Sequence, residues 1–303
     1  MEIEATKSDI RIDIYLSEEL DISRSKIQKL IKQNKILVNG KSINSSYNIK
    51  ENDKILVNDE LDFEINVEPE DIDIDIVYED DYLLIVNKAS GMVVHPAPGN
   101  YNHTLVNALL YRYKSLGSNK LRPGIVHRID KDTSGVMVVA KDDKTLELLS
   151  EMIKEKKVKR TYLAIVDGII PHATGTIDAP IGRDIQTREK MAVTDINSKD
   201  AITHFKVLKR FNNTNQTLIE CNLETGITHQ IRVHMAYIGY PIYNDPVYGK
   251  NKKTTSFGQF LHSKKISFIH PITGDLIEKE ADLPDEFKKY LDKIDIQEDK
   301  NSI

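Results

Sequence analysis

The sequence predicts an α+β protein in which helices flank a central mixed, mostly antiparallel sheet, preceded by a small N-terminal domain. From about residue 77, apolar runs typical of buried strands recur, and several follow one another with no helix between them. Such a succession favours an antiparallel or mixed sheet over a regular strand–helix alternation. A helix is predicted over residues 145–157, where large apolar side chains recur at helical spacing.

Changes in composition predict the domain boundaries. The predicted segments are a small domain (9–58), an acidic linker (59–76), a main domain (77–291) and a charged, loose tail (292–303). The DIDIDIV run at the linker's end alternates strictly, which is typical of an edge strand whose acids face water.

The bulk composition is that of a soluble globular protein, with 40% hydrophobic and 29% charged residues among 303. No apolar run approaches the roughly 18 residues that a membrane helix needs. The N-terminus lacks a signal-peptide core. We therefore expect a cytoplasmic protein with no membrane partner. The one cysteine, Cys221, excludes an internal disulfide and a multi-thiolate metal site, and we expect it in the core.

The charge distribution favours a polyanionic partner although the net charge is −5. Residues 62–81 hold ten acids and no base, and removing them leaves +5 for the remainder. Residues 23–50 hold seven bases and no acid. A patch of one sign and this density attracts nucleic acid, although a solvated helix face is an equally good interpretation.

The small domain is predicted to begin with a helix that Ser23 caps and that runs to about Asn34. Ile27, Leu30 and Ile31 would form its buried face. The candidate RNA-binding residues around it are Arg24, Lys26, Lys29, Lys32 and Lys41.

Two short β-like runs, ILVNG and KILVN, follow this helix, with Asn39-Gly40 as a turn signal. The string ISRSKIQKLIKQNKILVNGK closely resembles the small α-L RNA-binding domain of the ribosomal protein S-four type.

The string RPGIVHRIDKDTSG, residues 122–135, is a predicted loop directly before a buried strand. Loops held by a rigid sheet often carry catalytic groups. His127, Arg128 and Asp130 converge in it, and a neighbouring guanidinium favours the charged form of a carboxylate, which suits a nucleophile or a base. The residue types alone leave open that Asp130 only caps a turn.

The string HQIRVH places His229 and His234 five residues apart, with Arg232 between them. This spacing is poor for a metal, because on a strand the two rings face opposite sides. Arg232 is more informative, since a buried arginine needs an anionic partner and Asp130 is one.

Two further residues are weaker candidates. Tyr162 begins a strand after a basic helix end, and it is either a core residue or a ring that stacks on an extruded base. Lys88 lies in VNKASGMVVHP, a turn with one cation.

Taken together, these strings resemble the RluA-type pseudouridine synthases, in particular the RluD-like and RluC-like members with the same N-terminal module. HRIDKDTSG is similar to the family's HRLD-x-x-[ST]-[ST]-G loop, with Ile129 in place of Leu. PIGRDIQTREKMAV, THFKVL, HQIRVHMAYIG and LHSKKISFIHPITG match other family segments in the family's order. The resemblance spans about residues 10–285 and implies the pseudouridine synthase fold.

The resemblance implies an enzyme that isomerises uridine in structured RNA, with large-subunit ribosomal RNA as the expected substrate, as a monomer without metal or organic cofactor. It implies that Asp130 is the catalytic aspartate, that Arg232 pairs with it and that Tyr162 stacks on the target base and assists proton removal at carbon 5. Arg128 would fill the space left by the flipped nucleotide. The remaining substrate-binding candidates are His127, Leu261 and Lys88.

This chain departs from the family pattern at three positions. Ile227 replaces a usual Arg, Ala89 a common Pro and Asn244 a common Gly. The loss of the Arg puts substrate choice or the strength of RNA binding in question.

Three alternatives stay open on the sequence. The first is a non-catalytic RNA-binding or ribosome-assembly factor, and the second is a synthase whose substrate is tRNA. The third, a hydrolase using Asp130 and His127, is disfavoured because the sequence has no Ser or Cys nucleophile motif and no metal-ligand cluster. The route is also open: Asp130 attacks the sugar, adds to the uracil ring or removes a sugar proton.

Overall fold

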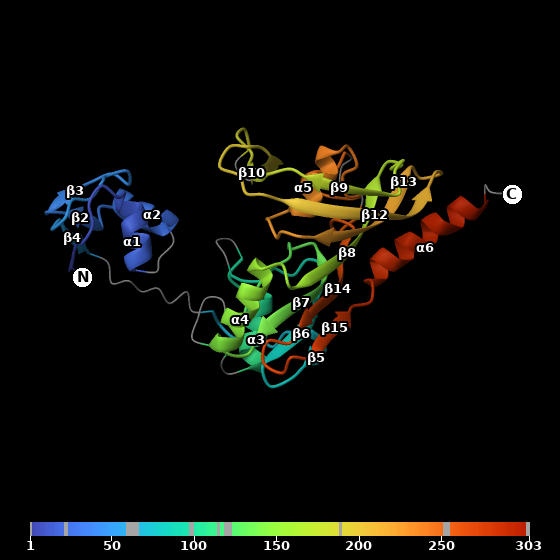
Figure 1. Ribbon diagram of the computed structural model, residues 1–303, viewed down its shortest axis with the longest axis horizontal. Helices are drawn as coiled ribbons and strands as arrows, with labels where there is room; N and C mark the ends of the chain where they lie inside the picture. Colours follow the sequence, from blue (N-terminus) through green and yellow to red (C-terminus); the bar gives the residue numbers. More distant parts are fainter. Residues whose placement is uncertain are drawn as a thin grey trace. The chain divides into compact units, whose positions relative to one another are not determined.

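The computed structural model describes residues 2–20, 24–58, 67–96, 100–113, 116–117, 123–187, 190–250 and 255–300. The chain divides into two compact units, residues 1–66 and 67–303 (Figure 1). The candidate N-cap Ser23 and the first part of the acidic linker, residues 59–66, lie outside the described residues.

The first unit packs two helices on a four-stranded sheet of order β1-β4-β2-β3. Its elements are β1 (Glu2–Glu4), α1 (Ile12–Glu19), α2 (Arg24–Lys32), β2 (Ile36–Val38), β3 (Lys41–Ser42) and β4 (Lys54–Val57). The helix prediction is confirmed, because α2 buries Ile27, Leu30 and Ile31. The turn prediction is confirmed too: Asn39 and Gly40 have φ of 49° and 74° and connect β2 to β3, which suits a two-residue hairpin.

A buried carboxylate ties α1 to α2. Asp13 accepts hydrogen bonds from Arg11 Nε at 3.0 Å, Arg24 Nη2 at 3.2 Å and Gln28 Nε2 at 2.6 Å. Burial alone would raise the pKa of Asp13, but these donors lower it to about 2. Arg24, a candidate RNA ligand, therefore also has a structural partner within the unit.

The second unit is built on one large sheet of order β5-β6-β7-β14-β8-β13-β12-β9, in which β15 also pairs with β14 (Figure 1). Among the strands that the structure describes, β7 and β14 alone pair in parallel, so the predicted mixed, mostly antiparallel sheet is confirmed. The strands are β5 (Asp75–Glu79), β6 (Leu83–Lys88), β7 (Ser134–Ala140), β8 (Lys159–Asp167), β9 (Thr174–Asp178), β12 (Ile202–Phe211), β13 (Gln216–Leu223), β14 (Leu261–Ile269) and β15 (Leu276–Glu280). A separate hairpin joins β10 (Ile181–Arg183) to β11 (Met191–Val193).

Helices cover both faces of this sheet. They are α3 (Leu105–Arg112), α4 (Asp143–Lys154), α5 (Gln230–Tyr237) and α6 (Asp285–Lys300). Along β6, Leu84 and Val86 pack in the same cluster as α3, whereas Leu83 and Ile85 pack in the cluster of α4. This alternation explains why the strand run is apolar at every position. None of the described helices combines the length and apolar character that crossing a bilayer needs.

Cys221 lies where it was expected. It is fully buried in the cluster that joins the sheet to α3 and α5. Burial raises the pKa of its thiol above the ordinary value, so the group is a poor nucleophile.

The C-terminal prediction is wrong. Residues from Asp292 were expected to be loose, but α6 continues through Lys300. Its apolar face buries Phe287 and Ile294 in a cluster with Phe260. The spacing of seven residues between these two positions places them on one side of a helix, and the charged composition of the tail masks this pattern.

The acidic run before the sheet is partly a strand. β5 lies at the edge of the sheet, but it begins only at Asp75, so residues 71–74 of the DIDIDIV run precede it.

Candidate active site

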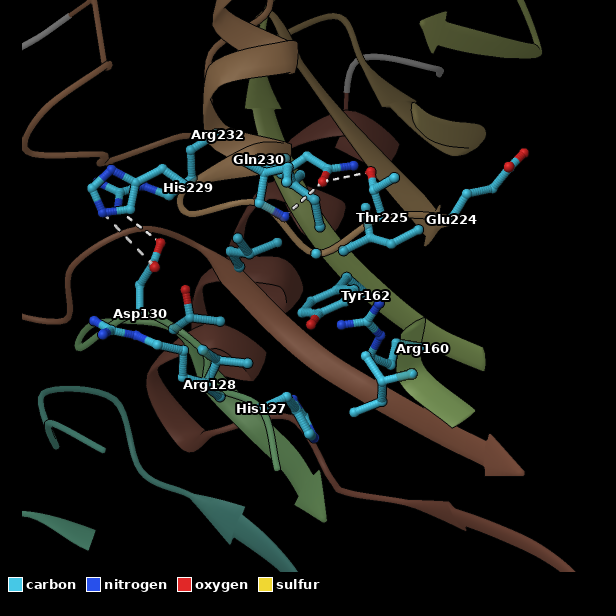
Figure 2. Close-up of a pocket in the computed structure, with 18 of the residues that line it drawn as sticks. His127, Arg128, Asp130, Arg160, Tyr162, Glu224, Thr225, His229, Gln230 and Arg232 are labelled. Carbon is cyan, nitrogen blue, oxygen red and sulfur yellow. Dashed lines mark hydrogen bonds and ion pairs between the residues drawn. The ribbon is translucent and has the colours of Figure 1, made fainter. Parts of the chain in front are cut away.

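A cavity of about 550 Å³ opens in the second unit where four segments converge. They are the loop before β7, the end of α4, the start of β8 and the chain between β13 and α5 (Figure 2). Six predicted site residues line it: His127, Arg128, Asp130, Tyr162, Arg232 and Leu261. This volume is within the range of pockets that enclose small ligands.

The loop that carries Asp130 is held in place by its neighbours. The Gly91 amide donates to the Lys131 carbonyl at 2.9 Å, and the Ser90 hydroxyl donates to the Asp132 carbonyl at 2.9 Å. Ile129 anchors the loop in the main core. These contacts fix the backbone on either side of Asp130, and a fixed backbone is what a catalytic side chain needs.

The glycine that ends the HRIDKDTSG string has a packing reason. Gly135 has a φ of 112°, and a Cβ there would lie 2.2 Å from the Ser263 carbonyl oxygen. Glycine therefore allows β7 to approach β14 directly after the loop.

The predicted pairing of Asp130 with Arg232 is present. Arg232 Nη1 donates to Asp130 Oδ2 at 2.9 Å, across 102 positions of sequence (Figure 2). The same guanidinium donates through Nε and Nη2 to the two oxygens of Asp245, at 2.7 and 2.9 Å. Arg232 thus binds Asp245 through two nitrogens and Asp130 through its third.

This ion pair is buried, since Arg232 is only 4% exposed. Burial by itself would lower the pKa of Arg232, but the Asp245 hydrogen bonds and the charge of Asp130 raise it above its ordinary value. Burial likewise opposes the charge of Asp245, yet the bonds from Arg232 lower the pKa of that carboxyl group. The backbone amides of Val247 and Tyr248 also donate to Asp245, so its anion is well satisfied.

The HQIRVH string forms the first turns of α5. His229 is its N-cap residue with a left-handed φ of 60°, and its Nε2 lies 3.8 Å from Asp130 Oδ1. His234 is buried on the helix, where it contacts the Thr203 hydroxyl and the Ala179 carbonyl. The two histidines therefore have separate partners, and His229 belongs to the surroundings of Asp130.

Tyr162 and Leu261 form an apolar part of the cavity wall. They come from the neighbouring strands β8 and β14 and are 5% and 4% exposed. Burial raises the pKa of the Tyr162 phenol, so the group is protonated at neutral pH. An aromatic ring fixed in this way is suited to stacking on a flat ligand.

The prediction that Lys88 binds substrate is corrected. Lys88 is 1% exposed and does not line the cavity. Its Nζ donates to the carbonyl oxygens of Ala89, Met92 and Lys131 at 2.7, 2.8 and 2.9 Å, which occupies all three of its hydrogens. Burial lowers the pKa of Lys88 to about 7, against the opposing charges of Asp130 and Asp132. Lys88 thus supports the loop from behind.

His127, a lining residue of the cavity, keeps one ring nitrogen without a described partner. The Val138 amide donates to its Nε2 at 3.2 Å, so the proton of the neutral ring is on Nδ1, a buried atom with no described partner. Burial, with a contribution from the charge of Arg160, lowers the pKa of His127 to about 3. The ring is therefore neutral at physiological pH.

Arg128 lies at the exposed side of the same loop. One of its guanidinium nitrogens, Nη1, lies 3.3 Å from His95 Nε2. Its charge is thus at the rim of the cavity, where it is accessible to a large partner.

Three residues of the site escape prediction from the sequence: Asp245, His229 as a neighbour of Asp130, and Arg160. A signal for Arg160 exists, because it lies two positions before Tyr162 on β8 and hence on the same side of the strand. No local signal selects Asp245.

The departures from the family pattern are accommodated. Asn244 has a φ of 59°, a conformation that asparagine tolerates better than most residues, and its amide donates to the Gly258 carbonyl at 2.6 Å. Ile227 packs against the small cluster of Ile181 and Val233 and adds apolar surface to the cavity. Ala89 supplies one of the carbonyls that bind Lys88.

Replacing Arg232 by Met should destabilise the second unit by about 3–5 kcal/mol, because Asp245 would be left buried without its partner. Urea unfolding of the purified variant measures this. The double variant with Asp245→Asn should lose less stability than the sum of the single variants. Strict additivity would contradict the assigned coupling.

His127→Asn should flatten the pH dependence of the unfolding free energy between about pH 6.5 and pH 3. An unfolded histidine gains a proton near pH 6.5, whereas the folded group gains it only near pH 3. The stability that His127 contributes is therefore present above pH 6.5 and lost as pH falls, by up to about 1.4 kcal/mol per unit. Urea titrations at several pH values measure the slope. Equal slopes in wild type and His127→Asn would refute the expectation.

Comparison with known families agrees with the site. The sequence model of RNA pseudouridylate synthases matches residues 82–237, and that of the S4 domain matches residues 10–55. An uncharacterised RNA pseudouridine synthase of Bacillus subtilis is 47% identical over 294 residues, which is 96% of each chain. Ribosomal large subunit pseudouridine synthase D of Zymomonas mobilis is 46% identical over 256 residues, or 80% of each chain.

The fold has solved relatives as well. Human RNA pseudouridylate synthase domain containing 1 superimposes with a TM-score of 0.60 at 26% identity, over 73% of this chain and 87% of that one. The chain therefore belongs to the RNA pseudouridine synthase family, whose enzymes isomerise uridine in RNA, and it carries an S4 domain ahead of the catalytic one.

Proposed function

We propose that Asp130 is the catalytic carboxylate of this enzyme and that its substrate is a uridine of large-subunit ribosomal RNA. One observation carries the first part: Asp130 faces a nucleotide-sized cavity while a buried guanidinium, itself fixed by Asp245, holds it. The names of the relatives from Zymomonas mobilis and Xanthomonas campestris, at 46% and 39% identity, support the second part.

The reaction makes three demands on the site. It breaks the N-glycosidic bond, rotates the uracil and joins it again through carbon 5. The uridine must first leave its stack, which costs a few kcal/mol. Arg128, charged and at the rim, suits the space that the nucleotide vacates. Tyr162 and Leu261 suit the two surfaces of a bound base.

The electrostatics favour a restricted role for Tyr162. A buried phenol with a raised pKa is a poor base at neutral pH. We therefore assign Tyr162 to stacking rather than to proton removal at carbon 5. For Asp130, attack on the sugar, addition to the ring and removal of a sugar proton all remain compatible with its position.

Affinity for the RNA comes, in this proposal, from the first unit. Lys29, Lys32 and Lys41 are exposed there, and Lys26 lies on the same helix as the first two. Their charges lie within a segment that has no acid from residue 23 to residue 50. A monomeric state and a location in the cytoplasm stay predictions from the sequence.

Asp130→Asn should abolish turnover while the fold and the RNA affinity are kept, because the substitution preserves shape and removes the charge. The measurement is tritium release from in vitro transcribed large-subunit RNA labelled at carbon 5 of uracil. Circular dichroism controls for folding. Substantial release by a well-folded variant would remove Asp130 from the catalytic role, and analysis of the RNA product separates isomerisation from cleavage.

Joint replacement of Lys26, Lys29 and Lys32 by Ala should weaken RNA binding and flatten its salt dependence. Each lost phosphate contact should lower the log–log slope by about 0.9 for duplex sites or about 0.7 for single strands. The matched control replaces the exposed Lys288, Lys289 and Lys293 of α6, which removes the same charge. If both triple variants bind alike, the first unit does not supply the affinity in this way.

A further inference from the structure

Arg160 is a buried cation that pairs with no anion among the described residues. Its side chain is 7% exposed and lines the active-site cavity from β8. Its Nε has no hydrogen-bond partner, and no carboxylate of the described residues forms an ion pair with its guanidinium. Arg232, equally buried, has two carboxylates. A buried charge without compensation is costly, so its retention points to a partner that arrives from outside the chain.

His127 adds a second unused donor beside it. The Nδ1–H of the neutral ring is buried without a described partner, because Val138 occupies Nε2. The charge of Arg160 contributes to the low pKa of His127, which indicates that the two groups are close. Figure 2 shows both on the side of the cavity away from Asp130, with Tyr162 between Asp130 and Arg160.

Gly226 lies close to this guanidinium. An added Cβ there would be 3.0 Å from Nη1 and 3.5 Å from Nη2 of Arg160. A side chain at residue 226 would therefore crowd the fork.

Further charged side chains line the cavity. They include Lys154 and Lys156. The acid nearest to them in the lining, Glu224, is already bound to Lys156 at 3.0 Å and to His204 at 2.7 Å. It is therefore not available to neutralise Arg160.

We propose that Arg160 and His127 Nδ1–H form a phosphate-binding subsite, which takes a phosphodiester group adjacent to the flipped uridine. The inference rests on the proposed RNA substrate. A guanidinium fork matches two phosphate oxygens, and a neutral imidazole N–H can donate to one more acceptor. Anchoring the RNA backbone on one side of Tyr162 would hold the uracil against the Tyr162 ring. It would also direct the ribose of the same nucleotide toward Asp130.

The first experiment measures RNA affinity against salt for Arg160→Gln. The probe is a synthetic RNA hairpin that spans the uridine modified in a large-subunit transcript. The variant should bind about 10- to 100-fold more weakly, with a log–log salt slope lower by about 0.7 to 0.9. Lys209→Gln is the matched control, because it removes one positive charge from β12, where Lys209 pairs with Asp295 outside the cavity. Its affinity should match the wild type.

A second readout separates phosphate binding from a structural role. In a series of hairpins, each carries one neutral methylphosphonate at a different backbone position. At one of these positions the substitution should weaken binding to the wild type but cause no further loss of binding to Arg160→Gln. Equal losses in both proteins at every position would overturn the proposal and leave a base carbonyl as the partner.

Stability and turnover supply the remaining controls. The Arg160→Gln variant should unfold at the same or a higher urea concentration, because an uncompensated charge has been removed. Should that variant fail to fold, Arg160→Lys keeps the charge without the fork, and its hairpin binding should be intermediate. Tritium release at saturating RNA measures the catalytic step assigned to Asp130 independently of RNA affinity. Normal release with unchanged affinity would refute the subsite alone, whereas no release from the wild type would refute the proposed function.

Discussion

The guanidinium of Arg232 is the interaction on which the site depends. Asp245 holds it through two hydrogen bonds of 2.7 and 2.9 Å, and it holds Asp130 through a third of 2.9 Å. The three residues come from α5, the segment after it and the loop before β7, so this chain of charges joins parts that are distant in the sequence. Since Arg232 and Asp245 are almost fully buried, removing Arg232 would leave Asp245 without its ion-pair partner, and removing Asp245 would leave Arg232 with Asp130 alone. Asp130 is therefore held in position by this buried ion pair, although it lies on a loop.

The cavity around this pair carries charges of both signs. Asp130 and Glu224 line it as carboxylates, Glu224 being paired with Lys156, and Figure 2 shows Asp130 and Arg160 on opposite sides. The protonated Tyr162 and the apolar Leu261 lie in the wall between them. A nucleotide has the complementary layout, with an anionic backbone and a neutral, flat base. Lys88, bound to three backbone carbonyls behind the loop, keeps this geometry without contact with the cavity.

Much of this could be predicted from sequence where a local pattern determines the structure. The apolar spacing of α2, the Asn39-Gly40 turn and the consecutive strand runs each follow from chain periodicity, and all three were confirmed. The Asp130–Arg232 pair was also predictable, because a buried arginine requires an anion and a turn-rich loop offered one.

What could not be predicted depends on three-dimensional proximity. Asp245 is one of 47 acidic residues, and the residues next to it in the sequence do not indicate that it contacts Arg232. Lys88 was misassigned because its position in a turn-like string hid the alternation of β6, which directs it to the same side as Leu84 and Val86. The charged composition of the tail concealed the apolar face of α6 in the same way.

The most direct test of the central claim is the single-turnover rate of Asp245→Asn at saturating RNA. Asp245 is 1% exposed and does not line the cavity, so the substitution acts on the reaction through the groups that Asp245 binds, of which Arg232 contacts Asp130 directly. If Arg232 positions Asp130, the rate should fall by about 100-fold while RNA affinity stays the same. A folded variant that reacts at the wild-type rate would contradict the account.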